Sequence, residues 1–384
     1  MLPDRLEFCT SFLTGKDPVK CRGDLPVEGK MKRFSGQNQQ YPDPSQPPDQ
    51  GQNSFNTGGS KKCKTSQSFE SLFDSESLSD VRISINDGIY TFHGHKMIIG
   101  LKSPILAALM NDLPTTGEET PVLHLNETEE CSHVFHRFLY FVYSGAVWLH
   151  RDYVVPLQKL AVKYDVVPLI QHCENYILQI LNSTFSSVRS PSRGEDRGEQ
   201  TGFSVEVTCD LHESNSMGEH VKNVAFMVLC TRAKDIIHSP RWRTCGYDVV
   251  CELLKNDECQ AVENALLTAA TNWMKSNNLQ DKSKIEGILT NIRYPLLHRR
   301  VLYHLQKNNA FKNFPPVQDL VNAAIRYHCF KDLPEAKGDF KGIQYTPRVP
   351  RPPDGAREVP AVLPDPDPDP VPQEYENTTS SPQH

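Results

Sequence analysis

The sequence of 384 residues contains no hydrophobic run long enough for a transmembrane helix. Its longest uninterrupted apolar stretch, Val224 to Cys230, is far shorter than the roughly 18 residues that span a bilayer. The first residues do not form the apolar core of a signal peptide, because Asp4, Arg5 and Glu7 interrupt them. We therefore expect a protein of the cytoplasm or nucleus without membrane contact, and a secreted protein only if a leader is missing from this chain.

Motifs of catalysis and nucleotide binding are also missing, namely G-x-S-x-G, the P-loop, G-x-G-x-x-G and H-E-x-x-H. The eleven cysteines form no C-x-x-C pair and have no zinc-ligand spacing, which indicates reduced, mostly buried thiols. With 41 basic and 47 acidic residues the net charge is −6, which argues against bulk binding to nucleic acid. The sequence therefore predicts no enzyme, no metal and no cofactor.

Length and composition indicate two folded domains with spare chain at both ends. The stretch from Gly36 to Ser60 is rich in Gln, Pro, Asn and Gly and contains little apolar surface to bury. The chain becomes proline-rich again near its end, which favours an extended conformation. The predicted division is a disordered tail 1–65, a first domain 66–182, a polar linker or insertion 183–219, a second domain 220–333 and a disordered tail 334–384.

The first domain reads as a small sheet flanked by helices, which is an α/β fold. Val81, Ile83 and Ile85 alternate as on one face of a strand, and the run 86–88, Asn-Asp-Gly, predicts a hairpin turn before the next strand. A helix over 103–110, a strand over 122–125 and a helix over 134–144 follow, the last of them ended by Gly145. Two more amphipathic helices cover 157–164 and 169–177.

The second domain reads as all-helical. Apolar residues recur at helical spacing over 224–229, 249–254, 262–273, 285–292, 296–306 and 317–327. Asp257 is expected to cap the third of these helices, and Ser283 with Glu286 is expected to form a capping box for the fourth. Pro295 is expected to stop that helix.

Residues 79–110 resemble the start of a BTB/POZ domain; their sequence is SDVRISINDGIYTFHGHKMIIGLKSPILAALM. The later runs FLYFVYSGAV and LAVKYDVVPLIQHCENYI are similar to later helices of that family. The resemblance covers about 110 residues in the right order. The positions that carry it at the start are Asp80-Val81, Phe92, His95-Lys96 and Ser103.

The helical half is similar to a BACK domain, through LLKNDECQAVENALLTAATNWMKS and NIRYPLL. Within the BTB–BACK family, the chain resembles the galectin-3-binding-protein-like group in NIRYPLL and in LVNAAIRYHCF. It departs from that group by its polar stretch over 187–219, by the absence of a leader and by ending soon after the helical half. A shortened relative is therefore expected.

The resemblance implies a homodimer and an adaptor function. Phe69, Leu72 and Phe73 have the spacing of one helical stripe over 67–78, as a dimer-interface helix would need. The alternative is that this stripe packs on its own domain. Asp80 and Lys96 resemble the family's charged pocket pair, although a structural ion pair without a ligand role is favoured. His95 is expected to hold strand and helix together.

The resemblance also implies a cullin-3 ubiquitin-ligase scaffold as partner, together with a substrate protein of unknown identity. Leu113 is the candidate apolar anchor and Tyr143 a second candidate contact, although Pro114-Thr115 replaces the family's x-Glu. A secreted oligomeric glycoprotein is an alternative, with sequons at Asn126, Asn182 and Asn377. Another alternative function is that of a transcriptional co-regulator that does not itself contact DNA.

Two further motifs have a plain and a functional interpretation. Lys61 to Lys64 is a nuclear signal or, as we favour, a solvated charge run. The Pro-x-x-Pro repeats from Pro347 to Pro353 carry Arg348 and Arg351 and could dock in an SH3-type groove. A plain spacer is the favoured interpretation of those repeats.

Overall fold

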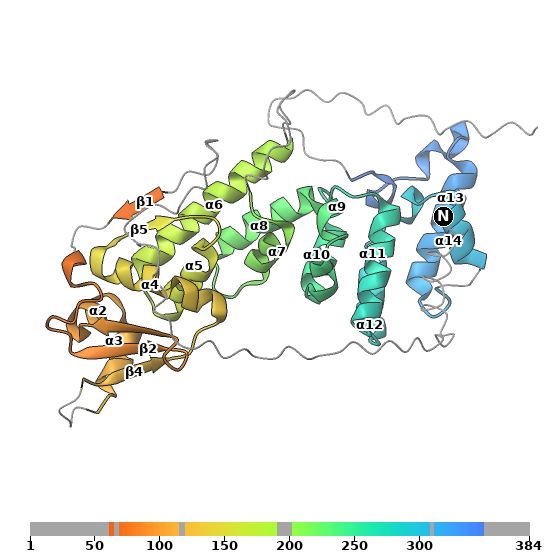
Figure 1. Ribbon diagram of the computed structural model, residues 1–384. Coiled ribbons are helices and arrows are strands. Elements are labelled where there is room, and N and C mark those ends of the chain that lie inside the picture. The colour runs from red at the N-terminus through yellow and green to blue at the C-terminus, as the bar shows by residue number, and fades with distance from the viewer. Residues whose placement is uncertain (1–60, 65–68, 115–119, 190–201, 308–310, 349–384) are drawn as a thin grey trace, which may run out of the picture. The chain divides into compact units, whose positions relative to one another are not determined.

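The computed structural model describes residues 61–64, 69–114, 120–189, 202–307 and 311–348 (Figure 1). Most of the two expected disordered tails therefore lies outside the described residues. The chain first forms a small α/β domain and then continues as a succession of helices. This order agrees with the fold class expected from the sequence.

A three-stranded sheet forms the base of the first domain, with strand order β3-β2-β4. The central strand β2 pairs antiparallel with β3 and parallel with β4. The predicted alternation holds, because Val81, Ile83 and Ile85 are completely buried while Arg82 is exposed. The strands are β2 (Val81–Ile85), β3 (Tyr90–Gly94) and β4 (Val122–Leu125).

The predicted hairpin turn joins β2 to β3. Asn86, Asp87 and Gly88 all have positive φ, at 48°, 56° and 88°, as this type of tight connection requires. The Asn86 side chain also accepts a hydrogen bond from the Glu127 amide at 2.7 Å and donates one to its carbonyl at 3.0 Å. The turn is thereby tied to the segment that leads into the next helix.

Two short helices follow the hairpin where the sequence predicts one. Ser103 lies between them, accepts a hydrogen bond from the Leu106 amide and donates one to the Tyr164 carbonyl at 2.6 Å. It is therefore the cap of the second of these helices, which is the predicted one, with Pro104 in the first turn. The helices are α2 (Lys96–Lys102) and α3 (Pro104–Asn111).

Helix α4 (Glu129–Ser144) is the central helix of the first domain. Thr128 caps its start, and Gly145 ends it in the left-handed conformation with φ of 64°, which confirms the predicted stop. The chain then enters strand β5 (Ala146–Leu149), which pairs antiparallel with β1 (Lys61–Lys64). The expected tail 1–65 thus ends in a strand, because β5 supplies hydrogen-bond partners for that backbone.

The expected linker over 183–219 is partly folded. Helix α6 (Val167–Arg189) extends well beyond the predicted domain boundary, and helix α7 (Val205–Glu213) begins after a segment outside the described residues. Ser204 caps α7, and Cys209 and Leu211 are completely buried. The polar residues that precede and interrupt this helix hid it, although Val205, Thr208, Cys209 and Leu211 are buried.

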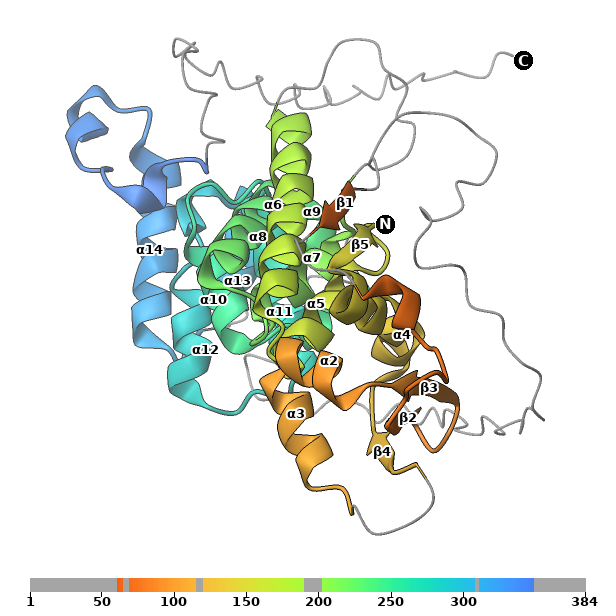
Figure 2. The same cartoon turned by 90° about the vertical axis from the view of Figure 1, so that its left-hand side faces the viewer.

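Two apolar clusters form the core. The first runs from the sheet through α4, α5 (Val154–Lys163) and α6 to α8 (Glu219–Thr231), and the second occupies the later helices. Figure 2 shows α6 near the middle of the view with α8 beside it. Helix α7 contributes Leu211 to the first cluster and Cys209 to the second, so it is shared between them.

The remaining helices follow in chain order and supply most of the second cluster. They are α9 (Ala233–Ile236), η2 (Pro240–Thr244), α10 (Tyr247–Lys255), α11 (Glu263–Ser276), α12 (Lys282–Leu289), η3 (Tyr294–Leu296), α13 (Arg299–Lys307) and α14 (Pro315–Phe330).

Two predicted helix caps are wrong. Asp281, not Ser283, caps α12, since its carboxylate accepts hydrogen bonds from the amides of Ser283 and Lys284. Asp257 does not cap α11, because it forms an ion pair with Arg293 instead. The first error arises because a nearby acidic residue takes the cap position, and the second because a tertiary partner holds the predicted cap.

The end of the described chain is held on the helical domain, although 334–384 was expected to be disordered. Short 3-10 turns η4 (Pro334–Gly338) and η5 (Ile343–Tyr345) precede Arg348. The Arg348 guanidinium bonds Glu263 Oε1 at 2.6 Å, and both side chains are less than 5% exposed. Because Arg348 is buried, it is not available to an SH3-type groove in this structure.

The same segment has further hydrogen bonds to the domain. Arg348 also donates to the carbonyls of Asn256 and Asn291 at 2.6 and 3.0 Å. From the domain side, Arg293 donates to the Thr346 carbonyl at 2.6 Å. The folded region therefore extends to at least residue 348.

Replacing Arg348 with Met should destabilise the protein by about 3 kcal/mol, because Glu263 is left buried without its cation. Urea unfolding followed by circular dichroism measures this free energy. Lys341→Met, at an exposed position in the same segment, is the matched control and should change stability by less than about 0.5 kcal/mol. Adding Glu263→Gln to Arg348→Met should recover part of the loss. Equal effects of the Arg348 and Lys341 variants would contradict the buried pair.

Candidate interaction surfaces

The segment expected to form an interface helix over 67–78 forms only one 3-10 turn, η1 (Glu70–Leu72), within its described part. The backbone explains the difference, because Asp74 and Leu78 have φ of 49° and 63°, which a helix does not allow. Asp74 accepts a hydrogen bond from the His93 amide at 2.8 Å, so a contact with β3 stabilises this conformation. The predicted interface helix is therefore wrong.

The three predicted dimer residues pack on their own domain. Phe69, Leu72 and Phe73 are partly buried against the first apolar cluster. The Phe73 ring lies edge-on to Tyr140 at 5.3 Å and to Tyr143 at 6.0 Å. This packing agrees with the alternative interpretation of the stripe, and a contribution to a dimer remains a prediction.

A buried hydrogen-bond chain joins α4 to the start of α2. The Tyr143 hydroxyl accepts from the His95 amide at 2.8 Å and lies 2.9 Å from His95 Nδ1. His95 Nε2 lies 2.9 Å from the Ser77 carbonyl, so the ring donates there and accepts from Tyr143. His95 therefore connects strand, helix and N-terminal segment, as expected.

Tyr143 is completely buried, and this burial raises the pKa of its hydroxyl to about 12. A residue in this position has no surface to offer a second protein. The expectation that Tyr143 contacts a cullin is therefore contradicted, since its side chain is used inside the domain.

Asp80 and Lys96 meet through the backbone of Lys96. Asp80 Oδ1 accepts a hydrogen bond from the Lys96 amide at 2.7 Å, at the first turn of α2. Among the described residues, these two side chains form no ion pair within 4.0 Å, and Asp80 is exposed. The structure gives Asp80 a capping contact, and a ligand pocket at this pair remains a prediction.

An exposed apolar strip covers the outer side of α2 and α3. Met97 and Leu101 are 70% and 69% exposed, and Ile105 and Leu109 are 44% and 38% exposed. The two helices pack closely, since a Cβ added at Gly100 would lie 3.3 Å from that of Ala107. We call these four residues the α2–α3 strip. Large apolar side chains left exposed on two packed helices indicate a candidate interaction surface.

This strip is not among the predicted sites, although its spacing in the sequence carries a signal. Both pairs are four positions apart, so each pair shares one face of its helix. Residues 97–110 are apolar at almost every position, and a helix packed on one side cannot bury all of them. The excess apolar face had to remain at the surface.

Leu113 follows α3 and is half-buried against the first cluster. Pro114 next to it is exposed. Glu118 and Glu119 lie outside the described residues. Part of the candidate cullin anchor is thus accessible, and its role remains a prediction.

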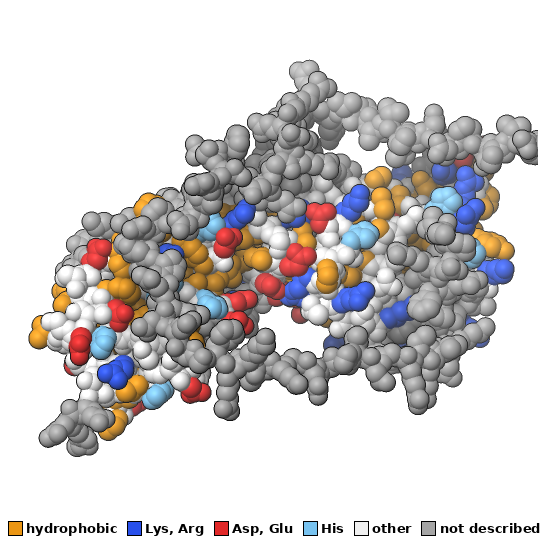
Figure 3. Space-filling model, in the orientation of Figure 1, with side chains coloured by type: hydrophobic (Ala, Val, Ile, Leu, Met, Phe, Trp, Pro, Cys, Tyr) orange, Lys and Arg blue, Asp and Glu red, His pale blue; other side chains and the backbone are white. Residues whose placement is uncertain are grey.

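A groove of about 850 Å³ lies between α4, α5 and α7. Behind it, the Arg137 guanidinium stacks on the Tyr153 ring at 4.5 Å. Figure 3 shows acidic, basic and hydrophobic side chains next to one another on the face in view. A mixed lining of this kind suits a protein segment. The groove's lining includes Arg151, Asp152, Tyr153, Lys159, Phe203 and Asp210.

Two of the three predicted sequons can be placed. Asn126 is exposed just after β4, and Asn182 is exposed on α6. Asn377 lies outside the described residues. Glycosylation at these positions remains a prediction.

Over the described ranges, no cluster of three or more His, Cys, Asp or Glu side chains could hold a metal ion. Within the same part of the chain, no helix combines the length and apolarity needed to cross a membrane.

Comparison with known proteins identifies both domains. A BTB/POZ domain model matches residues 69–181, and a model described as BTB And C-terminal Kelch, the BACK domain, matches residues 212–307. These matches confirm the predicted resemblance and the predicted order of domains.

Curated relatives match about three quarters of this chain at low identity. BTB/POZ domain-containing protein 17 of Xenopus tropicalis is 26% identical over 291 residues, covering 73% of this chain and 57% of the relative. The Homo sapiens protein of that name is 22% identical over 290 residues, covering 73% and 55%. Kelch-like protein 5 of Homo sapiens is 21% identical over 289 residues, covering 74% and 34%. The chain spans about half the length of the first two.

His136 on α4 predicts a pH dependence of stability. Burial, together with the neighbouring Arg137, lowers its pKa to about 4. The unfolded chain therefore binds a proton below about pH 6.5 that the folded chain does not, so stability falls as the pH drops. Between pH 7.5 and pH 5 the loss should be about 2 kcal/mol in urea unfolding.

His136→Gln should remove this part of the pH dependence. His133→Gln, on an exposed side chain of the same helix, is the control and should leave the wild-type pH dependence in place. A pH dependence that is identical in wild type and His136→Gln would contradict the assignment.

Proposed function

The chain contains a BTB/POZ domain followed by a BACK domain, and on this premise we propose that it is a non-enzymatic adaptor that forms a homodimer. The observation that carries the proposal is the exposed α2–α3 strip, since it lies within the BTB domain and has no partner among the described residues. A second copy of the chain is the occupant that we propose for it.

Several features support a second copy as occupant. The strip is apolar. An apolar surface can pair with the same surface of a second copy about a two-fold axis, which is the symmetry of most soluble homodimers. Burying the part of each large side chain that is exposed contributes about 1 kcal/mol. The N-terminal segment with Phe69, Leu72 and Phe73 packs on its own domain, and its part in a dimer contact stays a prediction beside that of the strip.

We also propose that the adaptor recruits a cullin-3 scaffold. The BTB–BACK resemblance implies this partner, and the half-exposed Leu113 at the end of α3 supplies an apolar contact next to exposed Pro114. Tyr143 takes no direct part, because it is buried. The groove between α4, α5 and α7 offers a second place for a partner segment.

A secreted oligomeric glycoprotein is the second candidate function. The observation that favours it is the exposure of the sequon residue Asn126 directly after β4. Loss of mass on glycosidase treatment of the chain expressed in a eukaryotic cell would support it. Unmodified Asn126 and Asn182 in such material would exclude it.

Met97→Glu together with Leu101→Glu should convert the dimer to a monomer, because a dry interface cannot accommodate four unpaired carboxylates. Light scattering at about 10 μM protein should show the mass falling by half. Val262→Glu, at a 71% exposed apolar position outside the BTB domain, is the control and should remain dimeric. A wild-type monomer at this concentration would refute the homodimer.

Leu113→Ala should weaken cullin-3 capture about fivefold or more, because truncating a buried Leu anchor costs about 1 kcal/mol or more, and about 1.4 kcal/mol corresponds to tenfold. Co-purification with immobilised cullin-3 measures it. Leu333→Ala, exposed beyond the BACK match, serves as control and should bind like wild type. The cullin role would be refuted if the wild type did not bind cullin-3 or if Leu113→Ala bound as strongly as the wild type. Neither result would affect the test of the homodimer.

A further inference from the structure

Two cysteines from separate parts of the helical domain are in direct contact. Cys209 lies on α7 and Cys245 ends η2, and their sulfur atoms are 3.4 Å apart. Both residues are buried, at 0% and 3% exposure, and both thiols are free. The two positions are 36 residues apart in the sequence, so the contact is a product of the tertiary fold.

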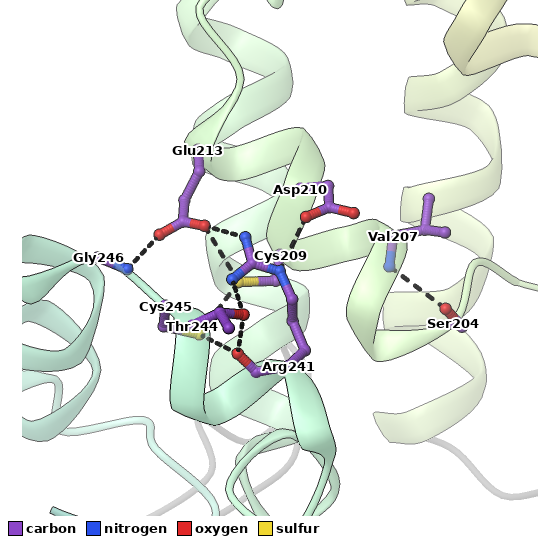
Figure 4. A network of polar contacts seen from close by, with 9 residues as sticks. All are labelled: Ser204, Val207, Cys209, Asp210, Glu213, Arg241, Thr244, Cys245 and Gly246. Atoms are coloured by element: carbon purple, nitrogen blue, oxygen red, sulfur yellow. Dashed lines mark hydrogen bonds and ion pairs between the residues drawn. The ribbon is translucent and has the colours of Figure 1, made fainter. Parts of the chain in front are cut away.

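Arg241 fixes the two elements relative to each other (Figure 4). Its guanidinium bonds Asp210 Oδ1 at 2.9 Å and also the Glu213 carboxylate, both on α7. The second Glu213 oxygen accepts from the Gly246 amide at 2.6 Å, directly after Cys245. α7 and the turn around Cys245 are thus held together on both sides of the sulfur pair.

The aromatic neighbours immobilise the same turn from the other side. The Trp273 indole donates to the Cys245 carbonyl at 3.0 Å, and the Trp242 indole donates to the Ala269 carbonyl at 2.9 Å. η2 is therefore anchored on α11 while Arg241 anchors it on α7. These contacts hold the backbone around Cys245 close to α7, and the two sulfurs lie in contact in this arrangement.

The surroundings distinguish the two thiols chemically. A hydrogen bond from the Cys209 thiol lowers the pKa of Cys245, and the charge of Arg241 lowers it further. The same hydrogen bond and burial raise the pKa of Cys209. Cys245 is flanked by exposed Thr244 and Gly246, so its turn lies next to solvent although its own side chain is buried. Its sulfur is the better nucleophile of the pair.

We propose that Cys209 and Cys245 are a redox modification site that forms a reversible disulfide with hydrogen peroxide as the oxidant. The Cys245 thiolate attacks one peroxide oxygen, the O–O bond breaks, and Cys245 sulfenic acid and hydroxide form. The Cys209 sulfur then attacks the sulfenic sulfur, the S–O bond breaks, and the departing oxygen leaves as water. In total two thiols and one peroxide give one disulfide and two waters, so both sulfurs are oxidised by two electrons together.

The disulfide would join α7 to the turn that precedes α10. Because α7 contributes to both apolar clusters, the bond would restrain the part of the chain where the two clusters meet. It also closes a loop of about 36 residues, which removes conformational freedom from the unfolded chain. The oxidised protein should therefore resist unfolding more than the reduced protein.

The test uses the full chain, reduced and then treated with hydrogen peroxide in up to tenfold excess. After alkylation of remaining thiols, peptide mapping without reductant should show a Cys209–Cys245 cross-link that dithiothreitol removes. The midpoint of thermal unfolding should rise by roughly 5–10 °C on oxidation. Cys329, which is exposed, reports that peroxide has reached the protein.

Single variants establish the order of the two steps. In Cys209→Ser, dimedone should trap a sulfenic acid at Cys245, because the second thiol is absent. In Cys245→Ser, neither the cross-link nor a trapped sulfenic acid at Cys209 should appear. Cys329→Ser is the matched control and should form the cross-link like wild type.

Three results would overturn the proposal. One is recovery of both thiols in reduced form under conditions that oxidise Cys329. Another is a Cys209–Cys245 bond that forms only after denaturation. The third is mixed pairing of either cysteine with other cysteines in comparable yield. The dimer and cullin experiments do not depend on these thiols, so their outcomes are separate.

Discussion

Helix α4 is buried on almost every side, and the arrangement of the first domain depends on this burial. From Cys131 to Ser144 only His133 reaches the surface. The sheet, α5 and the segment with η1 each present an apolar side to this helix, and Tyr143 connects it to the start of α2 by hydrogen bonds. Because the inner sides of α2 and α3 are also used for packing, their remaining apolar residues lie outside.

Helix α7 lies where the two apolar clusters meet, and it contributes buried residues to both of them. It is short and polar in composition, but it carries buried residues for both clusters and a carboxylate pair for Arg241. The helical domain thus depends at this point on an ion-pair clamp as well as on apolar packing. The same ion pairs hold the elements that carry Cys209 and Cys245, so the packing of the domain also places the two thiols in contact.

The elements that could be predicted from sequence are those with a local physical cause. The alternation of Val81, Ile83 and Ile85, the positive φ demanded at Gly88 and the stop at Gly145 each depend on residues within a few positions. The errors occur where distant residues compete. Asp257 pairs with Arg293, and Arg348 is drawn onto Glu263 from a stretch whose composition predicts a spacer.

The same distinction between local and tertiary causes applies to the interaction surfaces. The domain types, their order, the hairpin turn and the helix stop at Gly145 follow from the amino-acid sequence, because they depend on local spacing and on motif resemblance. Only the tertiary structure decided that Tyr143 is buried, that Met97 and Leu101 are exposed, and that Cys209 meets Cys245. The physical reason is that helical periodicity shows which residues share a face, whereas burial and contact depend on which distant element covers that face.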